Sequence, residues 1–144
     1  MNRILIEQYI PTAYKVLKNN PEIYVNEKIS GTLKGNIASF GAAIQMGNLL
    51  SAVAFFSQQG GAAEKRQELL HVILDILKEH GDAPGTCTTL FDYICDMGER
   101  EMPKAKQLVV CAAVAVKLAM NLFEPEKKAE KSRIKVRTEE AEGE

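Results

Sequence analysis

The chain has no tryptophan, and only 6% of its 144 residues are aromatic. Without an aromatic run or an RNP-type motif, we expect neither sequence-specific RNA readout nor extensive base stacking. The longest apolar run, residues 108–116, is far shorter than the roughly 20 residues that a membrane span needs. An acid, Glu7, stands near the start, and no signal peptide is apparent. We therefore predict a cytoplasmic protein without membrane contact.

Residue types that carry chemistry are also scarce. The two histidines, His71 and His80, lie in no nucleophile or base signature, and we interpret His71 as a boundary residue of a helix. The cysteines Cys87, Cys95 and Cys111 form no CxxC pair, and we read them as reduced thiols. No HxxxH motif or phosphate-binding GK[ST] loop is present. We predict no catalytic residue, no metal ligand and no cofactor.

Two pairs of carboxylates have the spacing of one helix face. They are Asp75 with Glu79 and Asp92 with Asp96. Paired carboxylates can serve acid–base or metal chemistry, but here they belong to an acidic region. We interpret them first as solvated surface and second as a docking surface for a basic partner.

Charge is segregated along the chain although the net charge is only −1. Residues 1–63 hold five basic and three acidic residues, residues 64–101 four basic and nine acidic, and residues 102–123 three basic and none acidic. This order predicts one basic and one acidic face, unless the charges are ordinary solvated surface. The basic face could follow a phosphate backbone.

Helical periodicity extends through residues 1–123, and we see no convincing strand. We predict an all-α fold, a compact bundle of about six helices in one domain. Pro11 should kink or divide the first helix, because it lacks a backbone donor. The third helix is apolar on most sides, which predicts a central position. The expected helices cover about residues 2–18, 27–46, 49–58, 62–79, 86–98 and 102–123.

Local signals refine three of these helices. Gly47 suits the end of the second helix, and Asn48 can cap the third. Small residues between 31 and 43 should let another backbone approach the second helix closely, because helical glycine otherwise costs about 1 kcal/mol. In the fifth helix we expect inward-facing side chains at Leu90, Phe91, Ile94 and Cys95.

The stretch from Lys28 to Phe56 resembles a known family. It contains SFGAAI at residues 39–44, MGNLL at 46–50 and AVAFF at 52–56. This pattern is similar to the small, all-helical subunit of the type III-B (Cmr) CRISPR effector complex. The close similarity covers residues 29–56, with a weaker one at residues 10–17. Asn48 departs from the family pattern, and residues 124–144 match nothing in it.

The resemblance implies a non-catalytic subunit of an RNA-guided ribonucleoprotein that targets invading RNA. Such subunits stack as copies of one another along the guide RNA and its paired target RNA, and they contact the other Cmr subunits. RNA cleavage belongs to a different subunit of the complex. The expected partners are therefore CRISPR guide RNA, target RNA, other Cmr subunits and further copies of this chain.

Backbone contact to RNA needs only suitably placed cations. Lys28 and Lys34 are expected on the second helix, Lys104 and Lys106 at the start of the sixth, and Lys15 and Lys18 on the first. These six lysines are the candidate nucleic-acid-binding residues. Each could equally be ordinary surface.

The segment 124–144 differs in composition from the rest of the chain. Six basic residues lie between 127 and 137, and four acids follow between 138 and 144. We predict a disordered charged C-terminal tail, with pairing to a partner's sheet edge around Ile134 and Val136 as the alternative.

Three other functions stay open. One is a helical protein–protein adaptor that does not bind nucleic acid. The second is a small enzyme that uses Cys95 or Asp92 in an assembled site. The third is the small subunit of a sister type III CRISPR complex.

Overall fold

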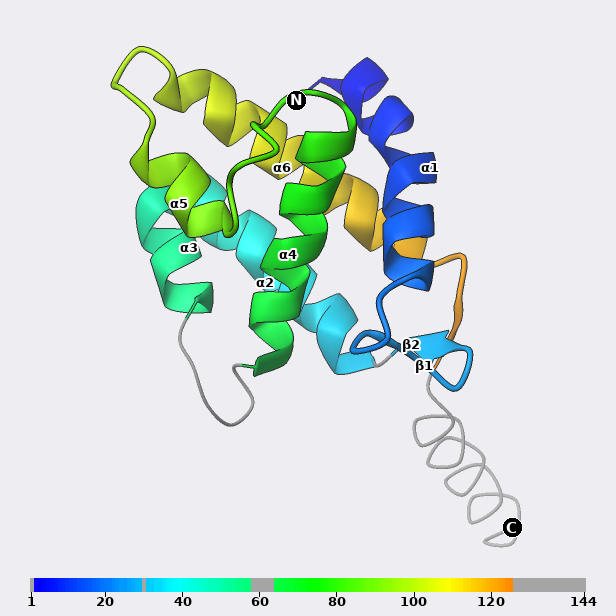
Figure 1. Ribbon diagram of the computed structural model, residues 1–144. Coiled ribbons are helices and arrows are strands. Elements are labelled where there is room, and N and C mark those ends of the chain that lie inside the picture. Colours follow the sequence, from blue (N-terminus) through cyan, green and yellow to red (C-terminus); the bar gives the residue numbers. More distant parts are fainter. Residues whose placement is uncertain (1, 30, 58–63, 126–144) are drawn as a thin grey trace, which may run out of the picture.

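The computed structural model describes residues 2–29, 31–57 and 64–125. These residues form the predicted all-α bundle, in which six helices pack around one core (Figure 1). The described helices are α1 (Arg3–Lys18), α2 (Gly31–Met46), α3 (Leu49–Phe56), α4 (Glu64–Glu79), α5 (Leu90–Cys95) and α6 (Met102–Met120). None of them is long and apolar enough to cross a membrane.

Helix α6 is the centre of the bundle. Alanine, valine and leucine side chains point in every direction around it, and most of them are buried. It packs on α1, α2 and α4, which surround it in Figure 1. The small alanines, among them Ala112 and Ala115, let these neighbours come close from several sides.

Helix α3, which we expected at the centre, lies at the periphery. Leu49, Val53 and Phe56 are buried on one face, but Phe55 on the opposite face is 53% exposed. The expectation was wrong because hydrophobicity on all sides does not require burial on all sides. An exposed apolar face can remain for a partner.

A three-stranded sheet of two-residue strands, which we did not predict, flanks one end of the bundle. Strand β1 (Tyr24–Val25) pairs antiparallel with β2 (Lys28–Ile29), and β3 (Glu124–Pro125) adds in parallel to β2. Asn26 and Glu27 make the turn with φ of 54° and 65°. Lys28 therefore lies on a strand and not on the second helix, and α2 begins only at Gly31.

Helix α1 runs unbroken across Pro11, so the proline does not divide it. The Asn2 side chain accepts a hydrogen bond from the Leu5 amide at its start. The predicted cap of α3 is confirmed, because the Asn48 side chain accepts from the Ser51 amide at 2.7 Å. Both caps satisfy amides that the first helical turn leaves unpaired.

Helix α5 is shorter than predicted, and its inward face differs. Leu90, Tyr93 and Ile94 are buried, whereas Phe91 and Cys95 are exposed. The Tyr93 hydroxyl donates to the backbone carbonyl of Asp82 at 3.2 Å. Six residues are too few for apolar spacing alone to fix which face turns inward.

Glu124 and Pro125 belong to the sheet, so the described fold extends to Pro125. The tail predicted beyond it, with its proposed disorder or edge-strand pairing, lies outside the described residues.

Candidate nucleic-acid interface

The six candidate lysines lie in separate parts of the fold. Lys18 ends α1 and Lys28 lies on β2, at the same end of the bundle in Figure 1. Lys34 is half-buried on α2. Lys104 and Lys106 begin α6, and about 24 Å of helix separates them from its C-terminal end beside the sheet. The fold does not bring these lysines into one patch.

An aromatic cluster supports the sheet end. The rings of Tyr14 and Phe123 stack with centroids 4.8 Å apart, and Tyr24 tilts against Phe123 at 5.3 Å. The ammonium of Lys18 lies 5.9 Å from the centre of the Tyr14 ring. Tyr14 and Tyr24 are only half-buried, so parts of their rings reach the surface.

A cation beside exposed aromatic surface suits single-stranded RNA, since the cation contacts phosphate and the ring stacks on a base. The sequence analysis missed this cluster because its members lie at positions 14, 24 and 123. No local motif links them. The signal in the sequence was only that Tyr14 and Lys18 have the i, i+4 spacing of one helix face.

On the sheet itself, Lys28 pairs with Val25 and lies beside Glu124 of β3. Val25 is 49% exposed, whereas Ile29, the next residue after Lys28, is fully buried. Because successive strand residues point to opposite faces, Lys28 belongs to the outer face of the sheet. It therefore adds a cation to the surface at the end where Lys18 lies.

The start of α6 is a mixed environment. Lys104 lines a hollow of about 380 Å³ together with Arg100, Asp82 and Glu101. The two carboxylates there oppose the attraction of the two cations for phosphate. Lys106, two residues further along α6, does not line this hollow and is half-buried.

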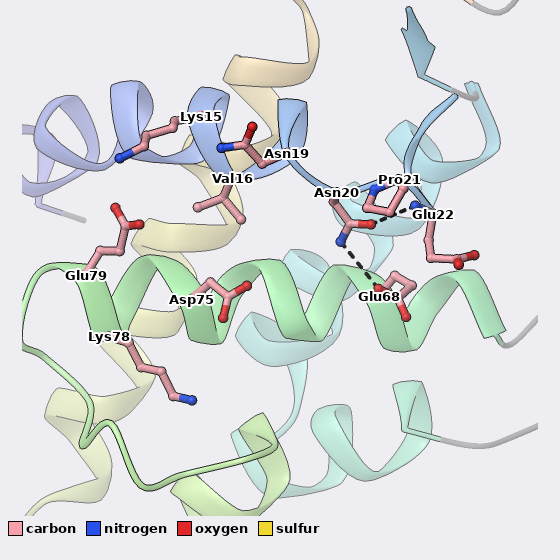
Figure 2. Close-up of a pocket in the computed structure, with 10 residues that line it drawn as sticks. All are labelled: Lys15, Val16, Asn19, Asn20, Pro21, Glu22, Glu68, Asp75, Lys78 and Glu79. Carbon is pink, nitrogen blue, oxygen red and sulfur yellow. Dashed lines mark hydrogen bonds between the residues drawn. The ribbon is translucent and has the colours of Figure 1, made fainter. Parts of the chain in front are cut away.

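Lys15 lies in a different setting, an acidic groove between α1 and α4. The groove has a volume of about 440 Å³. Figure 2 shows Lys15 of α1 directed toward Glu79 of α4, and Val16 of α1 opposite Asp75. Beyond its two lysines, Lys15 and Lys78, the groove is lined by the carboxylates of Glu22, Glu68, Asp75 and Glu79.

The carboxylates of this groove influence one another. Burial raises the pKa of Asp75, and the nearby Glu79 and Glu68 carboxylates raise it further, while Lys78 and His71 act in the opposite direction. The Asn20 amide donates to Glu68 Oε2 at 3.3 Å. Lys15 thus faces carboxylates and does not lie on a path of cations.

An uncharged face covers α2 and α3. No charged residue occurs between Lys34 and Glu64. Among its exposed side chains, Met46 is 89% and Phe55 53% accessible. The small residues of α2 contribute here, and they do not serve close packing within the chain: a Cβ at Gly31, Gly35 or Gly41 would meet no atom within 4 Å. The close approach of another backbone that the sequence predicts is therefore not made at these glycines by the described part of this chain.

The two histidines have structural surroundings. His80 Nε2 lies 2.7 Å from the Thr12 hydroxyl, and its ring meets Tyr9 edge-on at 4.9 Å. Tyr9 in turn donates to Asp82 Oδ2 at 2.5 Å. These contacts join α1 to the segment after α4. His71 is half-buried beside a small notch lined by Leu70, Leu90 and Phe91, as expected for a boundary residue.

The residues of the enzyme alternative lie together near α5. Cys87, Asp92, Cys95 and Asp96 line a shallow hollow of about 270 Å³, and Asp92 accepts a hydrogen bond from Thr88 at 3.1 Å. Within residues 2–29, 31–57 and 64–125, no three histidine, cysteine, aspartate or glutamate side chains converge as metal ligands.

We compared the chain with known proteins, and no family model, curated protein or solved structure matches it significantly.

Proposed function

We propose that the chain is a non-catalytic small subunit of a type III-B CRISPR ribonucleoprotein in the cytoplasm, where it contacts guide RNA and paired target RNA. The observation that carries the proposal is the uncharged α2–α3 face, because the residues that resemble the Cmr small subunit, 29–56, are those that form it. An uncharged surface with exposed Met46 and Phe55, on a chain with 26% charged residues, is typical of a protein contact.

The two surfaces have different roles in this proposal. The uncharged face contacts other subunits or copies of the chain, in a head-to-tail arrangement that can continue along an RNA. The sheet end, with Lys18, Lys28 and the half-exposed rings of Tyr14 and Tyr24, contacts the RNA backbone. Each copy adds few contacts, and affinity comes from many copies together.

The RNA contact is tested by reversing charge at the sheet end. We expect Lys18→Glu with Lys28→Glu to weaken binding of a guide–target RNA duplex. Because two phosphate contacts are lost, the slope of log K against log salt should decrease in magnitude by about 2. Fluorescence anisotropy over a series of salt concentrations measures both quantities.

The matched control is Lys104→Glu with Lys106→Glu, which changes the charge equally at the other end of α6. This control should leave the slope unchanged, and both variants should keep the wild-type circular dichroism spectrum. Equal losses in the two variants would show that the RNA responds to net charge alone and would reject the sheet end as the site.

The adaptor function is the second candidate, and the same uncharged face favours it. Purification of the tagged chain from its host at low salt separates the two. Short RNAs of uniform length together with CRISPR-associated subunits would support the ribonucleoprotein. A sister type III complex would be recognised by its different large subunits, and protein partners without RNA would support the adaptor.

A further inference from the structure

The acidic groove between α1 and α4 is not explained by the proposed function. Glu68, Asp75 and Glu79 occur at positions i, i+7 and i+11 of α4, which places them along one side of the helix. The opposite wall is α1 with the segment Asn19–Glu22 (Figure 2). The groove is therefore a row of carboxylates about 16 Å long that is closed on its second side by α1.

The lysines of the groove do not neutralise this row. Among the described residues, neither Lys15 nor Lys78 comes within 4.0 Å of the carboxylates of Glu68, Asp75 or Glu79. Figure 2 shows Lys78 directed away from Lys15. Lys78 lowers the pKa of Asp75, but burial raises it by more, and the pKa stays above its ordinary value.

A basic segment of the same chain begins close to this groove. Phe123 packs on Tyr14 of α1, and Pro125 pairs with Ile29 in the sheet. The segment Asn19–Glu22, which lines the groove, leads directly into β1 of the same sheet. The chain therefore leaves the described fold from the same sheet that the groove segment enters, with β2 between β1 and β3.

The sequence after Pro125 matches the groove in charge and in reach. Residues 127–137 contain one acid, Glu130, and six basic residues: Lys127, Lys128, Lys131, Arg133, Lys135 and Arg137. An extended chain advances up to about 3.3 Å per residue, so twelve residues reach roughly 40 Å. This reach exceeds the length of the carboxylate row more than twofold.

We propose that the groove between α1 and α4 binds the basic segment 127–137 of its own chain. Ion pairs at an exposed groove are individually weak, but the segment is tethered beside it, which gives a high effective concentration. Binding is electrostatic and is therefore released by salt. The proposal concerns the free protein and does not depend on the RNA function.

Zero-length cross-linking of the full chain with a carbodiimide tests the proposal, because this reagent joins a lysine amine to a carboxylate only when they touch. In an equal mixture of unlabelled and ¹⁵N-labelled chains, we expect cross-links from Lys127, Lys128, Lys131 or Lys135 to Glu68, Asp75 or Glu79 within single chains. The links should disappear at high salt. Mass spectrometry identifies both the residues and the isotope composition.

Three outcomes would overturn the proposal. One is an absence of these links at low salt. The second is a predominance of links to other acids, such as Asp92, Asp96 and Glu99. The third is links that join labelled to unlabelled chains, which would make the occupant a second copy.

A second measurement uses the rate at which trypsin cleaves the full chain after the basic residues of 127–137. The variant Glu68→Gln, Asp75→Asn, Glu79→Gln should be cleaved several-fold faster than wild type at low salt. As the salt concentration increases, the cleavage rate of wild type should rise toward that of the variant. The control Asp92→Asn, Asp96→Asn, Glu99→Gln loses the same charge elsewhere and should be cleaved like wild type. Equal rates in the groove variant and wild type would reject the proposal, provided both give the same circular dichroism spectrum.

Discussion

Tyr9 links three parts of the molecule with one side chain. Its ring is fully buried in α1, its hydroxyl donates to Asp82 at 2.5 Å, and its edge meets the His80 ring. Burial and the hydrogen bond to the Asp82 carboxylate both raise the pKa of Tyr9 above the ordinary value near 10. The fold therefore favours the neutral phenol.

Tyr9→Phe should lower the free energy of unfolding by about 1.5–3 kcal/mol at pH 7, because it removes a partly buried hydrogen bond to a charged group. In the unfolded wild type, Tyr9 ionises near pH 10, but in the fold only at higher pH. The contribution is therefore complete below about pH 10 and is lost as the pH rises further.

Urea unfolding at neutral pH and above about pH 10 measures both effects. The difference in the free energy of unfolding between Tyr9→Phe and wild type should become smaller above about pH 10. Tyr14→Phe is the control, since the Tyr14 ring stacks on Phe123 and that contact is kept. If Tyr14→Phe lowered the free energy of unfolding as much as Tyr9→Phe does, the result would contradict the role given to the Tyr9 hydroxyl. Some alkaline sensitivity should remain in Tyr9→Phe, because burial and the Asp82 charge also raise the pKa of Tyr93.

At the scale of the elements, α2 is a helix whose outer face is made of small residues. Gly35 is exposed within it, and a Cβ there would meet no atom within 4 Å. The glycine thus has a conformational cost in the free chain without a packing benefit inside it. Its benefit, if the proposed function is correct, belongs to the contact with another subunit.

Gly35→Ala should therefore raise the free energy of unfolding of the isolated chain by about 0.5–1 kcal/mol. Each kcal/mol should raise the Tm by about 2–4 °C, which thermal unfolding measures. Gly81→Ala provides the opposite case, because Gly81 has φ +73° and alanine is strained there. A lower Tm for Gly35→Ala would mean that the helix needs glycine for its own fold. Weaker assembly with a higher Tm would assign the glycine to the interface.

Long periodic segments made most of the elements predictable. Helices α1, α4 and α6 follow the apolar spacing of the sequence, and Asn48 marks the start of α3 as a capping residue should. The strand β2 was missed because its turn uses Glu27 at φ 65°, a conformation that the sequence does not indicate for glutamate. Its pairing with β3 joins residues almost 100 positions apart, which no local pattern can reveal.

At the scale of the whole molecule, the candidate site was only partly predictable. The sequence identified the basic residues, and the proximity of Lys18 to the ring of Tyr14 follows from their i, i+4 spacing in α1. The stacking of that ring on Phe123, in contrast, depends on how α1 lies beside the end of α6. Likewise, Asp75 and Glu79 were recognised as one helix face, whereas the α1 wall that turns this face into a groove is a tertiary contact. Basic and acidic residues that lie in different parts of the sequence do not necessarily lie on different faces of the folded molecule.

If both proposals hold, the groove and the RNA compete for the basic segment. Neutralising the groove with Glu68→Gln, Asp75→Asn and Glu79→Gln releases six cations, so RNA affinity should increase several-fold at low salt. By linkage, RNA should in turn lower the yield of cross-links between that segment and the groove. Anisotropy with the guide–target duplex measures the affinity.

The control for this prediction is Asp92→Asn, Asp96→Asn, Glu99→Gln, which removes the same charge from another surface. If RNA affinity increased equally in both variants, the change in net charge alone would explain the increase. Unchanged affinity in the groove variant would separate the groove from RNA binding, while the cross-links would still decide whether the segment docks there.

The central position of α6 also has a consequence for biosynthesis. Every larger helix of the bundle packs on it, yet α1, α2 and α4 all precede it in the chain. While a ribosome is still adding residues before Met102, the sides of these helices that pack on α6 remain uncovered, although α1 and α2 can already contact α4. The nascent chain is therefore most dependent on chaperones just before synthesis of α6 is complete, and closure of the bundle is a late event in translation.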